Sequence, residues 1–122
     1  DAGRIYQTWP LMGINYFPDD VTVKKLLDLL DFSNHSLVQF YHRNLAYVIV
    51  FYSLIISYFS FKEKDKKIFT STIFMISTIL LQIFLGIFTL YSNLNIAVSS
   101  AHQISSIILI LSALNLYYSI IK

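Results

Sequence analysis

Two histidines lie inside apolar stretches of this chain, where ionisable side chains are rare. His42 stands about five residues into one apolar run, and His102 stands about six residues into another. An ionisable group at membrane depth is costly, so it marks a functional site by default. Each neutral imidazole offers one ligand nitrogen. A pair at equal depth on two helices therefore matches the two axial positions of a haem iron.

Further polar residues accompany this pair. Arg43 follows His42, and we expect it to bind a haem propionate through two hydrogen bonds. Gln39, one turn before His42, and Gln103, in the other run, are expected to orient the ligands or to bond propionates. Gly86 lies in the run between them. It removes a side chain where a macrocycle or a neighbouring helix must come close.

The same residues also fit a plainer interpretation, in which the histidines only bridge helices and the small residues only pack. One small and polar stripe on the middle run consists of Thr78, Gln82, Gly86 and Thr89, and Ser99 and Ser106 flank His102. A zinc or copper centre fits less well, because two histidines without cysteine or a nearby carboxylate leave the coordination incomplete. His35 precedes the apolar runs and is expected to be solvated. No nucleophile–base–acid grouping is visible, so catalytic residues are not predicted.

Three long apolar runs must position these residues: 37–61, 68–91 and 96–121. Each exceeds the roughly 20 residues that a helix needs to cross a bilayer. Hydrophobic residues make up 56% of the chain and charged residues only 13%, with a mean hydropathy of +0.60. We therefore expect an all-α polytopic membrane bundle, in contact with lipid. It contains three transmembrane helices and a short outer-side amphipathic helix.

Composition excludes several other classes for these 122 residues. The absence of cysteine excludes a disulfide scaffold. The apolar content, with 16% aromatic residues, excludes intrinsic disorder. A net charge of +2 from scattered Lys and Arg gives no basic face, so nucleic acid is not an expected partner.

The loops predict an orientation in the membrane. Residues 62–67 include four lysines and Lys122 ends the chain, whereas residues 92–95 carry no Lys or Arg. By the positive-inside rule, the lysine loop and the C-terminus face the cytoplasm or matrix. The segment 1–36 and the 92–95 turn then face the opposite, outer side.

The first 36 residues form a separate outer-side segment, followed by the three-span half at 37–122. Prolines follow Trp9 and Phe17 and break regular structure. Asp19 and Asp20 suit a helix start. Apolar residues then recur at helical spacing and predict a short amphipathic helix, lying at the membrane surface or as a lid on the spans, with Val23, Leu26, Leu27 and Leu30. The chain begins with Asp1 and shows no signal peptide, so we expect a segment of a longer protein.

Five stretches together resemble the C-terminal half of haem A synthase, a cytochrome oxidase assembly family of bacteria and mitochondria. They are residues 1–12, 18–20, 38–47, 82–90 and 101–103, and their order and spacing agree over nearly the whole chain. Without cysteine, the chain resembles the alphaproteobacterial and mitochondrial branch.

This resemblance implies eight transmembrane helices in two similar four-helix halves. Residues 1–3 would end the fifth helix, and the three runs would be helices six to eight, so that the chain contributes three transmembrane helices of a four-helix half. It implies that His42 and His102 are the axial ligands of haem b. The implied reaction oxidises the C8 methyl of haem O to the formyl group of haem A, in the bacterial or mitochondrial inner membrane. Implied partners are the substrate haem O, the N-terminal half and haem O synthase. The piece alone is expected to bind haem without catalysing.

Two other functions remain open from the sequence. The same pair of histidines fits a small haem b membrane-anchor subunit that only transfers electrons. A non-catalytic membrane assembly protein is the remaining class. Optical spectra of bound haem distinguish the non-catalytic protein from the two haem-binding classes. Conversion of haem O to haem A then distinguishes the enzyme from the electron carrier.

Overall fold

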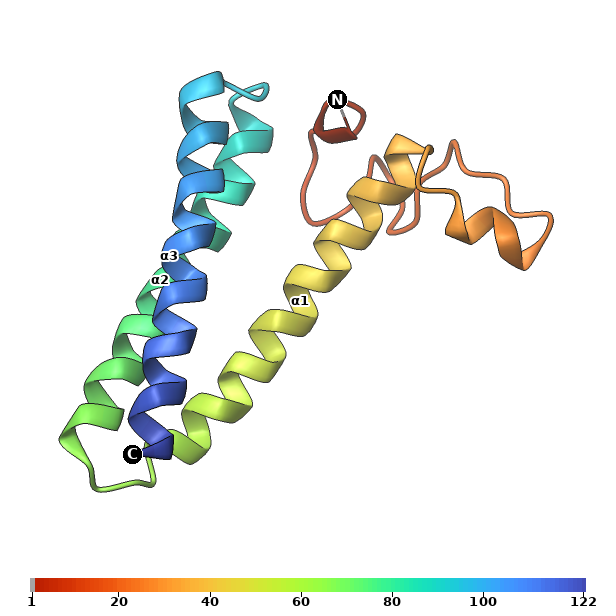
Figure 1. Ribbon diagram of the computed structural model, residues 1–122. Helices are drawn as coiled ribbons and strands as arrows, with labels where there is room; N and C mark the ends of the chain where they lie inside the picture. The colour runs from red at the N-terminus through yellow and green to blue at the C-terminus, as the bar shows by residue number, and fades with distance from the viewer. Residues whose placement is uncertain (1) are drawn as a thin grey trace.

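A computed structural model describes residues 2–122, and the regular elements within them are helical (Figure 1). Three long helices follow one another as α1 His35–Ser60, α2 Lys66–Tyr91 and α3 Ile96–Ile121. Two 3-10 turns precede them, η1 Ala2–Arg4 and η2 Leu26–Leu30. The predicted all-α class is confirmed, and each span lies within two residues of its predicted bounds.

Each long helix begins at a side chain that caps its free backbone N–H groups. The Asn34 side chain accepts from the amides of Ser36 and Leu37 at the start of α1. The Asp65 side chain accepts from the amides of Lys67 and Ile68 at the start of α2. The Asn95 side chain accepts from the Ala97 amide at the start of α3. Such caps satisfy donors that the first turn cannot pair internally. They explain why the helices begin beside the polar loops.

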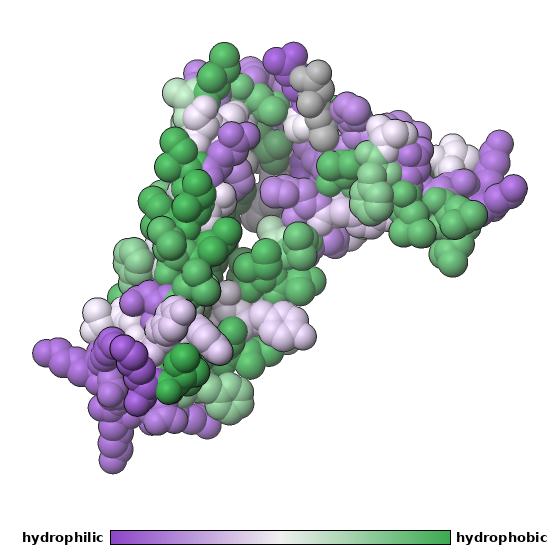
Figure 2. All heavy atoms as spheres, viewed as in Figure 1, coloured by the Kyte–Doolittle hydropathy of each residue, from purple (hydrophilic) through white to green (hydrophobic). Residues whose placement is uncertain are grey.

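The three helices are long and apolar enough to cross a membrane. Their lipid-facing side chains remain exposed in the isolated chain: Leu54 is 62% exposed, Phe84 63% and Ile110 60%. Hydrophilic residues gather at the lysine loop (Figure 2). The chain is therefore built as a multi-pass membrane protein. We call the end near the 92–95 turn the outer end and the end near the lysine loop the inner end, after the predicted topology.

Helices α2 and α3 pack side by side along their length and share buried hydroxyl groups. The Thr78 and Ser112 hydroxyls lie 2.9 Å apart, and those of Ser71 and Ser119 lie 3.0 Å apart. Asn115 donates its side-chain amide to Ser71 Oγ at 2.9 Å. Such bonds hold helices together where lipid offers no alternative partner. An apolar core lies between these polar contacts, formed by Ile68, Met75, Ile79 and Leu116.

Helix α1 leans away from this pair towards the outer end (Figure 1). Its inner half packs against the others: Val50 contacts the apolar core, and the Phe61 ring, which follows α1, lies 5.4 Å from Phe69 of α2. Its outer half is instead covered by the N-terminal segment, which contacts α1 through η1 and the loop that follows. Helix α1 therefore diverges from the α2–α3 pair at the end that carries both membrane histidines (Figure 1).

The N-terminal segment is less helical than its sequence predicts. The helix expected to begin at Asp19 and Asp20 is wrong in its start and length, since only Leu26–Leu30 forms a 3-10 turn. The Asp28 carboxylate accepts from the amides of Lys24 and Lys25 at 2.8 Å and holds them outside a helix. The predicted helix end at 1–3 falls partly on Asp1, outside the described residues; Ala2–Arg4 forms a 3-10 turn.

Candidate functional site

The two membrane histidines meet between α1 and α3, as their equal depth predicts. The ring centroids of His42 and His102 lie 6.4 Å apart, and their planes are inclined by 83°. An iron held by one nitrogen of each ring needs about 2 Å for each metal–nitrogen bond and about 1 Å more to each ring centre, hence about 6 Å between centres. The separation therefore suits two axial ligands of one metal.

The imidazole of His102 lies directly over Gly86 of α2. A Cβ placed on Gly86 would come within 3.1 Å of His102 Cε1 and 3.6 Å of Nε2. Contacts that close are rare for a real Cβ, so any other residue would push against the ring. The His102 ring thus occupies the space that a side chain on Gly86 would fill. The absence of that side chain determines how the ring packs on α2.

Three buried polar atoms near this ring have no hydrogen-bond partner among the described residues. They are His102 Nδ1, Ser99 Oγ on the preceding turn of α3, and Gln82 Oε1, one turn before Gly86 on α2. Buried polar groups are seldom left unpaired, because each costs the free energy of its lost hydration. Their clustering beside the histidine pair indicates that this part of the bundle is completed by a further polar partner.

The donor set itself favours haem over a bare metal ion. Within residues 2–122, no group of three or more His, Cys, Asp or Glu side chains could hold a metal ion. Two imidazoles alone leave zinc under-coordinated, whereas a haem iron needs only two axial ligands from the protein. The residues present therefore fit haem.

Arg43 and Gln39 lie close to His42 on α1, but their side chains bind the N-terminal segment through every polar group except Arg43 Nε, which is buried without a partner among the described residues. Arg43 donates from Nη1 to the Leu11 carbonyl at 3.1 Å and from Nη2 to the Tyr6 carbonyl at 3.0 Å. Gln39 accepts from the Tyr6 amide at 3.2 Å and donates to its carbonyl at 2.7 Å. Their predicted contact with a propionate stays a prediction.

The remaining predicted residues fall into different environments. Gln103 is exposed on α3, and His35, the first residue of α1, is exposed as expected. The predicted stripe on α2 divides: Thr78 bonds Ser112 of α3, whereas the Thr89 hydroxyl donates to its own helix. Only Gln82 and Gly86 from that stripe lie at the histidine pair. Ser106 likewise bonds its own backbone, donating to the Gln103 carbonyl.

Sequence reasoning missed a polar network that ties the N-terminal segment to the start of α1. The Asp20 carboxylate accepts from the Tyr6 hydroxyl at 2.7 Å and from the Ser36 hydroxyl at 2.6 Å. The bonds from Ser36 and then Tyr6 lower the pKa of Asp20, and the bond to Asp20 raises the pKa of Tyr6. Ser36, Gln39 and Arg43 are all buried on one face of α1. Their spacing of three and four residues was the sequence signal for this polar face.

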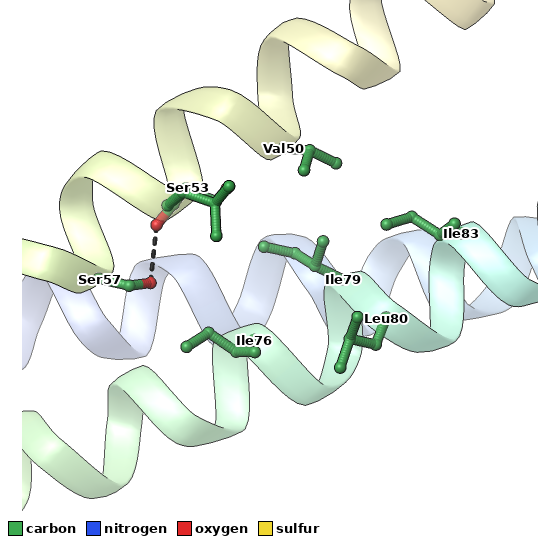
Figure 3. Close-up of a pocket in the computed structure, with 8 residues that line it drawn as sticks. Val50, Ser53, Ser57, Ile76, Ile79, Leu80 and Ile83 are labelled. Atoms are coloured by element: carbon green, nitrogen blue, oxygen red, sulfur yellow. Dashed lines mark hydrogen bonds between the residues drawn. The ribbon is translucent and has the colours of Figure 1, made fainter.

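A small apolar cavity of about 70 Å³ lies inward of the site between α1 and α2 (Figure 3). Its two hydroxyl groups are already paired within α1, because Ser53 donates to Ile49 and Ser57 to Ser53. Since no polar group points into it unpaired, it offers no chemistry of its own. It is lined by Val50, Ser53, Leu54, Ser57, Ile76, Ile79, Leu80 and Ile83.

Comparison with known proteins gives one consistent family. The model of the family described as cytochrome oxidase assembly protein (COX15-CtaA) matches residues 1–114. The chain is 39% identical over 118 residues to the heme A synthase of Pelagibacter ubique (strain HTCC1062), covering 97% of this chain and 34% of that protein. It is 33% identical over 122 residues to the heme A synthase of Rickettsia felis, covering 100% of this chain and 36% of that protein.

A relative from Wolbachia sp. subsp. Brugia malayi (strain TRS) agrees with these. That heme A synthase is 35% identical over 114 residues, covering 93% of this chain and 32% of the relative. The chain thus spans about a third of the length of the curated relatives it matches. No solved structure matches it significantly.

Proposed function

The chain belongs to the COX15-CtaA family of cytochrome oxidase assembly proteins, and on this premise we propose that it is the haem b-binding part of a haem A synthase. The observation that carries the proposal is the pair of imidazoles whose centroids lie 6.4 Å apart on two membrane helices. His42 and His102 are the axial ligands. Bound haem b supplies a one-electron redox centre within the membrane.

The chain's own residues hold and orient this group. Gly86 gives the His102 ring its place against α2, and a fixed ring keeps its nitrogen aimed at one point. The unpaired atoms of Gln82 and Ser99 offer polar contacts at the edge of the site. Gln103 is free to reach a propionate from the exposed face of α3.

The activity of the whole protein is part of the same proposal. It oxidises the C8 methyl of haem O to the formyl group of haem A, with the substrate held by a part of the protein outside these 122 residues. The names of the relatives support this reaction. We place the protein in the bacterial inner membrane, working beside a haem O synthase.

Two measurements on the full-length protein test the proposal. Purified protein should show sharp reduced bands of low-spin haem b, and a haem O-producing strain should accumulate haem A only when the gene is present. Bands without haem A would assign electron transfer instead of synthesis. The absence of bound haem in protein that folds and inserts would contradict the proposal altogether.

A further inference from the structure

Residues 3–20, here called the outer strap, connect α1 with the turn between α2 and α3. Gly3 lies against Leu94 so closely that a Cβ there would come within 2.8 Å of Leu94 Cδ2. The Tyr91 hydroxyl approaches the Trp9 carbonyl at 3.5 Å. The N-terminal end of the strap lies between the outer ends of α1 and the α2–α3 pair (Figure 1). The strap therefore touches both sides of the opening in which the two histidines meet.

Two side chains of α1 bind the backbone of the strap. The side-chain amide of Gln39 pairs with both the N–H and the C=O of Tyr6, as a neighbouring strand would. The Arg43 guanidinium joins the carbonyls of Tyr6 and Leu11, with one bond to each. Hydrogen bonds from a charged donor are stronger than neutral ones. The strap is thus held at Tyr6 and Leu11, three residues before and two residues after Trp9.

Burial shows that these bonds are more than surface contacts. Gln39 is 6% exposed and Arg43 is 8% exposed, and Met12, which follows the second carbonyl, is 1% exposed. Both Nη atoms of Arg43 donate to backbone carbonyls, whereas its buried Nε has no hydrogen-bond partner among the described residues. Turning the Nη groups towards another ligand would leave both carbonyls without this partner, at a cost in stability. The two Nη groups are therefore committed to the strap.

We propose that Gln39 and Arg43 are positioning residues, which hold the outer strap across the two-histidine site and act on bound haem through the strap rather than by touching it. This inference rests on the proposed haem-binding function. His42 is the adjacent residue on α1, so a displaced strap opens the outer side of the site beside its ligand. The strap then limits escape of the haem and entry of water.

Hydrogen–deuterium exchange in the full-length protein tests the strap without relying on activity. The variants are Gln39→Leu, Arg43→Leu and Arg43→Lys, with Gln7→Leu as the control, because Gln7 is an exposed glutamine of the strap itself. In haem-free protein, peptides covering 6–12 should exchange on the order of tenfold faster in both Leu variants. Arg43→Lys should be intermediate, because a lysine can reach only one carbonyl. The control should match wild type.

The second measurement is the rate at which loaded protein loses haem to apomyoglobin. Positioning through the strap predicts faster loss in Gln39→Leu and Arg43→Leu together, in the same order as their exchange rates. Faster loss in Arg43→Leu with unchanged exchange would overturn the inference and assign a direct contact with haem. Unchanged exchange in both Leu variants would overturn it as well. Wild type with a protected strap that binds no haem when haem is added would instead contradict only the proposed haem binding.

Discussion

The ring of His102 occupies the space that a side chain on Gly86 would fill, with Cε1 only 3.1 Å from the position of the missing Cβ. The position of a side chain on α3 is thus set by a residue of α2. The ring is coupled to the α2–α3 contact, which is the most extensive contact between the described helices.

Gly86→Ala should reduce haem retention, and Gly86→Leu should reduce it further, because each added atom displaces the His102 ring. Alanine favours a helix over glycine by about 1 kcal/mol, so loss of haem will not reflect a weakened helix. Haem content after detergent washing and the low-spin bands measure the effect. Phe84→Leu is the control, since Phe84 is 63% exposed on the same helix. Equal retention in all three variants would contradict the coupling.

His42→Ala and His102→Ala should each abolish the low-spin spectrum of two histidine ligands, whereas His35→Ala should keep it. Loss of one ligand leaves a five-coordinate iron, which turns high-spin. His35 is exposed, and its Nδ1 lies 3.0 Å from the Ser33 carbonyl, away from the pair. Optical and electron paramagnetic resonance spectra distinguish the two states. If the His42→Ala protein stays low-spin without a substitute ligand, the assignment of His42 on α1 as an axial ligand is wrong.

Acid should release the outer strap from α1 through Asp20. Because bonds from Ser36 and Tyr6 lower the pKa of this carboxyl below its usual 3.8, the stabilisation is fully present above that pH and is lost as the pH falls through the lower folded value. The fluorescence of Trp9, the one tryptophan of the chain, should report the change. Asp20→Asn should remove this acid transition, and Asp28→Asn should retain it. A wild-type signal that stays flat down to full unfolding would count against the link.

The hydroxyl pair between Thr78 and Ser112 should stabilise the α2–α3 contact modestly. A double-mutant cycle with Thr78→Val and Ser112→Ala should give a coupling free energy of about 0.6 kcal/mol, as is typical between membrane helices. Unfolding by steric trapping in bicelles measures it. Ser77→Ala combined with Ser112→Ala should show no coupling, because Ser77 is exposed and its hydroxyl bonds the Ile73 carbonyl of its own helix instead of Ser112. Coupling of equal size in both cycles would show that it does not come from the hydroxyl pair.

A reporter protein placed after Lys64 should lie on the cytoplasmic or matrix side. The lysines of residues 62–67 set this orientation. Alkaline phosphatase fused there should be inactive and green fluorescent protein bright, with the opposite result after Asn93. Active phosphatase after Lys64 would reverse the assignment of outer and inner ends.

The spans and the histidine pair were predictable because each depends on a single physical rule. Long runs without charge leave the chain no alternative to membrane helices, and helices α1 and α3, which run in the same direction, bring His42 and His102 to one depth. The Ser105, Ser112 and Ser119 spacing of seven residues also signalled the α2–α3 contact and was overlooked.

The partners of Arg43 could not be predicted in the same way. They are backbone carbonyls of an irregular segment, and carbonyls carry no residue identity in a sequence. The predicted start of the outer-side helix at Asp19 and Asp20 was wrong for a related reason. Asp20 caps no helix, because its carboxylate is bound by Tyr6 and Ser36, residues far from it along the chain. Local propensity gives way wherever distant groups compete for the same side chain.

Helix α1 packs against α2 at its inner end and leans away at its outer end (Figure 1), so a tilt about the inner end moves the outer end most. His42 lies 18 residues before the last residue of α1 at Ser60, so it stands about 27 Å from that inner end. Tilting α1 by one degree would move this imidazole by about 0.5 Å, a quarter of a metal–nitrogen bond of about 2 Å. Small changes in packing around Phe61 and Phe69, at the inner end of the bundle, would therefore be magnified at the His42 imidazole.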